Sequence, residues 1–331
     1  MGTRDEYHWN WYRSRMISAG YLAYRFGTST AVLACVSVLT FGMMYLTPGD
    51  PARSILYQQT GQQPSAEAVA AFRAEHGFDD PFVVRYYHWI TDALQGDLGA
   101  SYRTSRPVGT MIVEALPATI ELAFAAMAIA LVIAIPTGVA SAVYRDTWID
   151  QASQLFALVG VSMPNFWLGY LLIIVFSLHL GVTPVSGTGG LSHLILPAIA
   201  LGTGMAAIIT RLVRTSMLEV LEEPYVESAR SKGLSERIVI YKHALRNALI
   251  PVITVVGLQF GFVLNGAVVI EIVFQRPGLG MMLVDAIFAR DFPVVQGVVL
   301  VVAVLFVTTN LFVDLSYRVL DPRVQLGGEH S

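Results

Sequence analysis

Few residues in this sequence have the type and spacing that catalysis or metal binding requires. The seven histidines are scattered along the chain, and a single cysteine, Cys35, excludes an internal disulfide framework and any multi-cysteine metal site. Neither a Gly-x-x-x-x-Gly-Lys-Ser/Thr loop for ATP phosphates nor a His-Glu-x-x-His zinc motif occurs. The sequence therefore predicts no catalytic residue and no metal site in this chain.

The sequence around one serine partly resembles the motif of a catalytic nucleophile. Ser162 lies in Gly160-Val161-Ser162-Met163-Pro164, which is not the Gly-x-Ser-x-Gly pattern of a nucleophile elbow, and no base accompanies it there. Because proline breaks or kinks a helix, we expect Pro164 to interrupt an apolar helix and to line a path. An intramembrane hydrolase stays an alternative, and such a protein would be active when purified alone.

The densest group of basic residues lies between 211 and 248, a segment with seven of the 21 Lys and Arg, including both lysines. Pro224 suits the first turn of a helix, Gly233 suits a left-handed helix end, and Ser235 can cap a second helix. The pattern predicts a short helix, a sharp turn and a helix that continues into an apolar stretch. Two interpretations remain: a rigid lever that passes a push from a partner into the membrane, or an ordinary amphipathic loop.

The composition predicts the elements that position these residues, because 54% of the 331 residues are apolar and only 14% are charged. An ordinary soluble domain has about a quarter charged residues. Five stretches lack Asp, Glu, Lys and Arg over 24, 23, 60, 24 and 22 residues. About 20 helical residues cross a bilayer, so the longest stretch fits two crossings, divided by the turn-rich segment 181–190. The predicted fold is an all-α membrane protein with six transmembrane helices, near 27–47, 118–143, 154–180, 193–213, 249–270 and 294–318.

The distribution of positive charge predicts the orientation. Six crossings place both termini on one side, together with segments 143–150 and 211–248. That side holds fourteen Lys and Arg, against two near 273–293 on the other, once the long segment 47–117 is left out. Both termini are therefore predicted to be cytoplasmic. The net charge of −3 implies no attraction to polyanions, so nucleic acid is not a predicted partner.

The segment between the first two spans is predicted to fold outside the membrane. Ser65 can cap a helix that Gly77 closes, and Pro81 starts a second, amphipathic helix that ends at Gly96. This pair of helices is expected to pack on the outer mouth, either as a docking surface for an extracellular partner or as a spacer. The predicted division is a leader that is interfacial or disordered (1–26), a first span (27–47), the outer segment (48–117), a core (118–320) and a tail (321–331).

The spans contain almost none of the ionisable residues that relay ions in secondary transporters, which argues against proton- or sodium-driven transport. In the fifth span, Gly257 and Gly261 form a Gly-x-x-x-Gly pattern that allows close helix approach. Gln259 and Asn265 lie on the same span and could face a polar pathway. These four residues and Pro164 are the candidates for the pathway or for helix packing.

Several separated motifs resemble those of one transporter family. Residues 228–234 (Ser-Ala-Arg-Ser-Lys-Gly-Leu), followed by 243–251 (His-Ala-Leu-Arg-Asn-Ala-Leu-Ile-Pro), are similar to the coupling motif of bacterial ABC importer permeases. The resemblance is to the B-type permease subunit of the dipeptide, oligopeptide and nickel importers, and it covers about residues 21 to 325. The further motifs that carry it are Thr47–Pro51, Gly96–Ser101, Glu271–Gly280 and Asp321–Arg323.

The resemblance implies a permease that forms one pathway with a second, C-type permease in the bacterial inner membrane. Two cytoplasmic ATPase subunits would bind ATP and Mg, and an extracytoplasmic binding protein would deliver the substrate. This chain itself would be neither an enzyme nor a cofactor-binding protein. The helix near 225–232 would sit in a groove on an ATPase. The coupling residues so implied are Tyr225, Val226, Ser228, Ala229, Arg230, Lys232, Gly233 and Leu234.

The substrate that the resemblance implies is a short peptide, since most cargo of the family is peptide. Nickel, glutathione and haem relatives exist, and nothing in these residues separates them. A secondary transporter is the remaining alternative, and it would work without any ATPase.

Overall fold

The structure is a computed structural model that describes residues 19–46 and 49–320. Within these ranges no strand occurs, and one isolated antiparallel bridge joins Ala100 to Pro107. The all-α prediction is therefore confirmed. The helices in chain order, of which η1 and η2 are π-helical, are α2 (Ala19–Leu46), α3 (Pro51–Thr60), α4 (Ala66–Glu75), α5 (Phe82–Leu94), α6 (Val108–Val143), α7 (Trp148–Ser162), α8 (Asn165–Leu172), η1 (Ile173–His179), α9 (Leu191–Leu221), α10 (Pro224–Ser231), α11 (Glu236–Ile238), η2 (Val239–Ala244), α12 (Leu245–Val273), α13 (Leu279–Phe288) and α14 (Phe292–Leu320).

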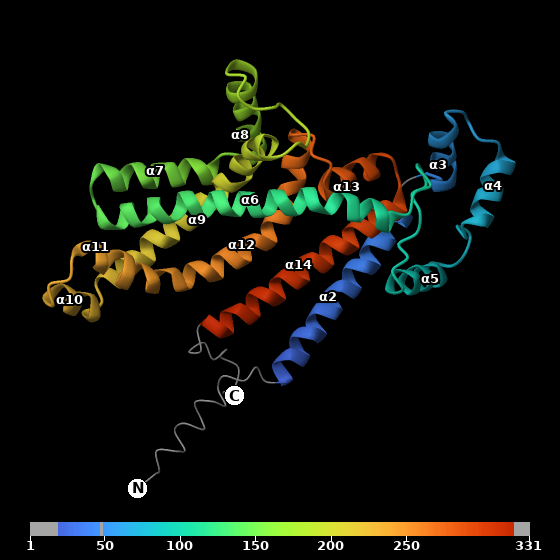
Figure 1. Ribbon diagram of the computed structural model, residues 1–331. Helices are drawn as coiled ribbons and strands as arrows, with labels where there is room; N and C mark the ends of the chain where they lie inside the picture. Colours follow the sequence, from blue (N-terminus) through green and yellow to red (C-terminus); the bar gives the residue numbers. More distant parts are fainter. Residues whose placement is uncertain (1–18, 47–48, 321–331) are drawn as a thin grey trace, which may run out of the picture.

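The long helices lie along one another, with α10 and α11 at one end of the molecule and α3, α4 and α5 at the other (Figure 1). Five segments are long and apolar enough to cross a bilayer, and a bent pair makes a sixth if it counts as one span. The five single segments lie in α2, in α6, in α9, in α11 through α12, and in α14. They correspond to five of the six predicted spans.

The predicted third span, 154–180, differs from a straight helix. It consists of α7 and the α8–η1 segment, which meet at an angle of 104°. Pro164 stands at the N-cap of α8 with an extended backbone, and Met163 before it is also extended. Proline disfavours a helical conformation in the residue before it, which explains why the helix breaks here.

Three predicted boundaries also differ from the structure. Residues 19–26 of the predicted leader belong to α2, which begins at Ala19. The last residues of the predicted outer segment belong to α6, which begins at Val108, directly after Pro107. α9 extends to Leu221, so the basic segment that starts at 211 begins inside a helix. The rest of the leader, the tail 321–331 and positions 47–48 lie outside the described residues.

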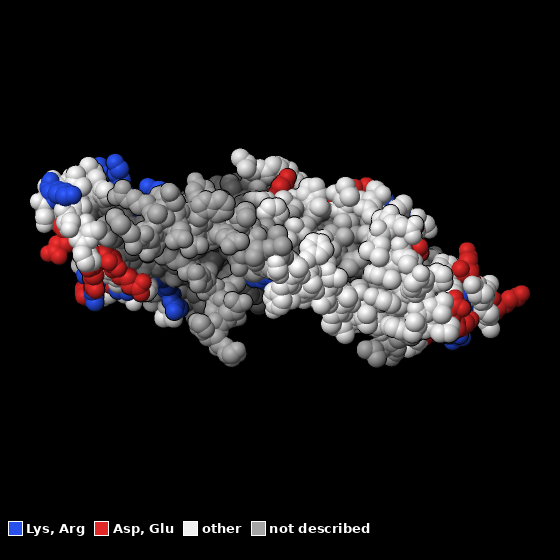
Figure 2. All heavy atoms as spheres, turned by 90° about the horizontal axis from the view of Figure 1, so that it is seen from below, with Lys and Arg blue, Asp and Glu red and all other residues white. Residues whose placement is uncertain are grey.

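The core lies where α6, α9 and α12 meet. Ala123, Ala126, Ala130 and Ala134 of α6 are all fully buried in it. Such small side chains let helices approach closely, as is typical of membrane bundles, where packing rather than the hydrophobic effect drives helix association. Large apolar side chains remain on the outer surface instead, and on the face shown in Figure 2 the charged side chains gather toward the two ends. This arrangement suits a protein whose middle lies in lipid.

The outer segment packs on α2. Phe41 near the end of α2 contacts the rings of Phe82, Tyr86 and Trp89 of α5, with centroid distances of 5.5 to 5.6 Å. The hydroxyl groups of Ser37 and Tyr86 are 2.7 Å apart. The aromatic side of the amphipathic helix α5 is therefore held against a membrane helix.

The two outer helices predicted from sequence are present as α4 and α5, and the oxygen of Ser65 caps α4 by accepting from the N–H of Ala68 at 3.1 Å. α3 is an additional helix, capped by Asp50. The turn before α14 anchors the loop after α5, because buried Asp291 accepts from the hydroxyl of Ser101 at 2.5 Å and from the N–H of Tyr102 at 3.0 Å. The outer segment is thus fixed to the membrane bundle.

Candidate functional site

The helix–turn–helix predicted between 211 and 248 is present. α10 starts at Pro224, and the chain turns at Gly233, whose φ of +75° lies in the left-handed region. The N–H of Gly233 donates to the carbonyl of Arg230 at 2.9 Å, which closes the turn. We call residues 232–235 the elbow. Beyond it α11, η2 and α12 follow without a gap, so the elbow leads into a membrane helix.

An ion pair spans the elbow. Arg230 Nη2 donates to Glu236 Oε1 at 2.7 Å, and Arg230 Nε donates to Glu236 Oε2 at 3.3 Å. The hydrogen bonds to Glu236 raise the pKa of Arg230 above its usual value, because the carboxylate stabilises the charged guanidinium. Ser235 occupies the predicted N-cap position of α11, but its side chain makes no capping hydrogen bond. The geometry of the elbow therefore depends on Gly233 and on this ion pair.

Two of the predicted coupling residues face the chain itself. Val226 is fully buried and Ala229 is 8% exposed, and both pack with Val239 of η2. Val220 and Leu221, at the end of α9, pack against the same cluster. This apolar pair therefore holds α10 against the adjoining helices.

The remaining predicted coupling residues are available to a partner. Tyr225 is 40% exposed and Leu234 is 38% exposed, and Ser228 and Lys232 are also exposed. The hydroxyl oxygen of Tyr225 accepts from Asn247 Nδ2 at 2.7 Å, which ties α10 to the start of α12. A protein that pushes on this surface would push on α12 directly.

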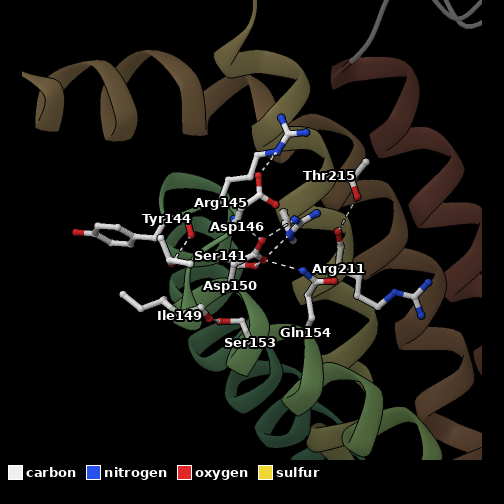
Figure 3. Close-up of polar contacts among 12 residues, drawn as sticks. Ser141, Tyr144, Arg145, Asp146, Ile149, Asp150, Ser153, Gln154, Arg211 and Thr215 are labelled. Carbon is white, nitrogen blue, oxygen red and sulfur yellow. Dashed lines mark hydrogen bonds and ion pairs between the residues drawn. The ribbon is translucent and has the colours of Figure 1, made fainter.

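The other helix that leads to α10, α9, is fixed by an ion pair with a buried carboxylate, which the sequence reasoning missed. Asp150, in the first turn of α7, accepts from Arg214 of α9 through two bonds of 2.8 Å, one to each carboxylate oxygen. Ser141 Oγ, the N–H of Asp146 and Gln154 Nε2 donate to the same carboxylate at 2.6, 3.1 and 2.9 Å, as Figure 3 shows. Five hydrogen bonds thus fix the carboxylate in one position.

A signal for this pair was available in the sequence. Asp150 immediately precedes the 60-residue uncharged stretch, and Arg214 lies shortly after its end. Since that stretch fits two crossings, the charges that bound it return to the same side of the membrane. An ion pair between Asp150 and Arg214 could therefore have been predicted from the sequence.

The broken span borders a recess. A cavity of about 260 Å³ lies between α7, α8, α9 and α12, and Gln259 contributes to its lining. Gly160, Met163 and Asn165, on either side of the break, line it too. Pro164 itself borders an adjoining apolar depression. The hydroxyl of Ser162 donates to the carbonyl of Leu158 at 2.8 Å, the ordinary bond of a helical serine, which does not favour a nucleophile.

The glycines of the fifth span contribute to helix packing. A Cβ at Gly257 would lie 2.7 Å from both methyl groups of Val313 in α14, and a Cβ at Gly261 would lie 3.1 Å from the ring of Phe306. The Gly-x-x-x-Gly pattern therefore allows α12 and α14 to approach. The side chain of Asn265 lies outside the described residues, so its predicted role stays a prediction.

The motif at 271–280 has a structural role. Fully buried Glu271 accepts from Thr119 Oγ1 at 2.6 Å and from the N–H groups of Gly280 and Met281 at 2.8 and 3.1 Å. The oxygen of Thr119 in turn accepts from the N–H of Leu279 at 2.8 Å. These bonds satisfy the first N–H groups of α13. The motif thus joins α6, α12 and α13 at the end of the bundle away from α10.

Family models match most of the chain. The model of the binding-protein-dependent transport system inner membrane component matches residues 134–326, and the model of the N-terminal part of such membrane components matches residues 18–123. The chain belongs to this family. The motifs that carried the resemblance therefore identified it correctly.

Curated relatives and solved structures agree with this assignment. The chain is 43% identical over 322 residues to the dipeptide transport system permease protein DppB of Alkalihalophilus pseudofirmus, covering 89% of this chain and 96% of the relative. It is 42% identical over 293 residues to the glutathione transport system permease protein GsiC of Escherichia coli (strain K12), covering 88% and 94%. The inward-facing MetNI methionine ABC transporter matches with a TM-score of 0.56 at 19% identity, covering 64% of this chain and 96% of that one.

The chain is therefore a multi-pass permease component of an ABC importer. The permease is not catalytic by itself, because ATP hydrolysis in such importers belongs to partner subunits. The secondary transporter and the intramembrane hydrolase, which the sequence had left as alternatives, are set aside by this assignment. The site consists of a surface at α10, an elbow, and helices α9 and α12 that lead from it to the recess.

Proposed function

We propose that this permease forms half of the translocation pathway of an ATP-driven importer for short peptides. A second, C-type permease supplies the other half, two ATPase subunits bind ATP and Mg and dock on α10, and an extracytoplasmic binding protein delivers the peptide. The single observation that carries the proposal is the continuity from the exposed face of α10, through the elbow, to α12, whose Gln259 lines the recess.

Both termini and α10 lie on the cytoplasmic side in this proposal. Fourteen of the Lys and Arg fall on that side, which is the distribution that the positive-inside rule requires. The arrangement in Figure 1 supports the same topology, because the first residues of α2 and the last residues of α14 lie together, away from α3, α4 and α5. An even number of crossings follows if the bent pair α7–α8 counts as one span.

The substrate is argued from the relatives. The names of DppB and GsiC specify a dipeptide and glutathione, and the two relatives are almost equally similar to this chain. Glutathione is itself a small peptide, so both names point to a cargo with peptide bonds and free carboxylates. A short peptide is therefore the substrate class, with glutathione as the second candidate.

The proposal is tested in liposomes that contain the complete importer. The binding protein is added on the side of the membrane from which the substrate is taken up. Radiolabelled dialanine and glutathione are offered separately, with ATP or with a non-hydrolysable analogue. Concentrative, ATP-dependent uptake of dialanine supports the peptide proposal, whereas uptake of glutathione alone assigns the second candidate. Uptake by this chain without the ATPase subunits would contradict the proposal.

A further inference from the structure

The ion pair between Asp150 and Arg214 joins α7 to α9 away from the recess. Asp150 is 1% exposed, and neither residue lines the recess or the apolar depression beside it. A carboxylate and a guanidinium in two-bond contact fix orientation as well as distance, which an apolar contact between helices does not. The three additional donors to Asp150 leave its carboxylate a single position. The pair is thus built to hold α7 and α9 at a defined angle.

The pair connects the two parts of the site. Arg214 lies on α9 ten residues before Pro224, the first residue of α10, and the end of α9 packs against the buried side of α10. Asp150 lies at the start of α7, and the other end of α7 reaches the recess through Gly160 and Val161. A helix of the length of α7 spans about 22 Å. A motion of α9 can therefore reach the recess through α7 only if the two helices do not slide on one another.

A second ion pair, between the turn before α7 and the end of α9, is much weaker. Arg145, in the turn between α6 and α7, approaches Glu222 at 3.5 Å, and the two side chains are 55% and 75% exposed. Exposed single-contact pairs of this kind are screened and contribute little. Of these two ion pairs, the one between Asp150 and Arg214 is accordingly the one that resists sliding of α7 along α9.

We propose that Asp150 and Arg214 are positioning residues that make α7 and α9 move as one body, so that displacement of α10 reaches the bend at Pro164 and the recess. The inference rests on the proposed function, because it assumes that ATPase subunits displace α10. It adds a route through α7 to the direct routes along α9 and α12, both of which line the recess. The pair contributes to coupling between ATP hydrolysis and transport, and it does not touch the substrate.

The experiment measures uptake per ATP hydrolysed in liposomes with the complete importer. Arg214→Lys keeps the charge but loses the two-bond geometry. We expect this variant to assemble and to hydrolyse ATP, while uptake of labelled dialanine per ATP falls roughly fivefold or more, the range of typical coupling energies. Arg145→Lys is the matched control, since it changes the exposed pair at the same turn, and its uptake per ATP should equal that of the unaltered importer.

A second variant keeps the test decisive if Arg214→Lys does not assemble. The double substitution Asp150→Asn with Arg214→Gln leaves no isolated buried charge, so it avoids the main cause of misfolding. Unchanged uptake per ATP in either variant that assembles overturns the inference. Loss of assembly in both variants also overturns it, since the pair would then serve folding alone. If the unaltered importer takes up neither dialanine nor glutathione, the proposed function fails, which is a different result.

Discussion

Arg230 Nη2 lies 2.7 Å from Glu236 Oε1, and this ion pair spans the left-handed turn at Gly233. The two residues belong to α10 and α11, so their contact links the helix that a partner can reach to the helix that enters the membrane. The side chains are 42% and 56% exposed, and the stability of such a pair is about 0.5 kcal/mol. The main contribution of this ion pair is therefore to the angle between α10 and α11, and its contribution to stability is small.

Reversal of one charge should open the elbow. In Arg230→Glu the new carboxylate faces Glu236 and also lies one turn from Glu227, so we expect weaker ATPase association and lower ATP-driven uptake. Pull-down of the ATPase subunits and uptake in liposomes measure these effects. The exchange variant Arg230→Glu with Glu236→Arg separates two causes: recovery of uptake assigns the effect to the shape of the elbow, and no recovery assigns it to direct contact of Arg230 with the ATPase.

Substitution of the elbow glycine should weaken coupling without preventing insertion. Val at position 233 would have to adopt a φ of +75°, which costs a β-branched residue about 1–3 kcal/mol. We expect Gly233→Val to reduce ATPase docking and uptake, while Gly233→Asn, which tolerates the left-handed region, retains most of both. Equal uptake in the valine variant and the unaltered importer would remove the turn from the account.

The stability of the contact between α12 and α14 should depend on the combined volume of the side chains at positions 257 and 313. A methyl group at position 257 would lie 2.7 Å from both methyl groups of Val313, so Gly257→Ala should lower stability by about 1–3 kcal/mol. The double variant Gly257→Ala with Val313→Ala removes those methyl groups and should regain part of the loss. Thermal denaturation of the purified complex provides the comparison, and additive losses in the double variant would show that the two residues are not in contact.

The carboxylate of Glu271 should be important for stability rather than for ATPase docking. Glu271→Leu leaves the hydroxyl of Thr119 and the N–H groups of Gly280 and Met281 without their acceptor, which costs on the order of 3 kcal/mol. We expect a lower denaturation temperature but normal binding of ATPase subunits in the protein that remains folded. Glu114→Leu is the control, because Glu114 is 57% exposed and pairs with Arg106, which is 49% exposed. A denaturation temperature equal to that of the control would contradict this role.

The sequence was sufficient for those features that depend on neighbouring residues. Pro224 and Gly233 predict the ends of α10 from local backbone preference, and uncharged stretches of about 20 residues predict spans whatever their neighbours are. Which residues of α10 are buried and which are exposed could not be predicted in the same way. Val226 and Ala229 are buried because Val239 and the end of α9 lie against them, and this is a property of the folded chain.

Long-range contacts account for most of what the sequence reasoning missed. Asp150 and Arg214 are separated by 64 positions, and Thr119 and Glu271 by 152, so no local pattern pairs them. Pro164 predicts that a helix breaks, whereas the angle of 104° follows from how α8 packs against α9 and α12. α13 was missed because a helix of ten residues is too short to be recognised as a span.

Site-directed photocrosslinking tests most directly whether the ATPase subunits engage the chain at α10. A photoreactive amino acid is placed at exposed Ser228 in the complete importer, and at exposed Val84 of α5 as the control. The account predicts an adduct with an ATPase subunit from position 228 and none from position 84. A transport-competent importer that yields no ATPase adduct from position 228 would contradict it.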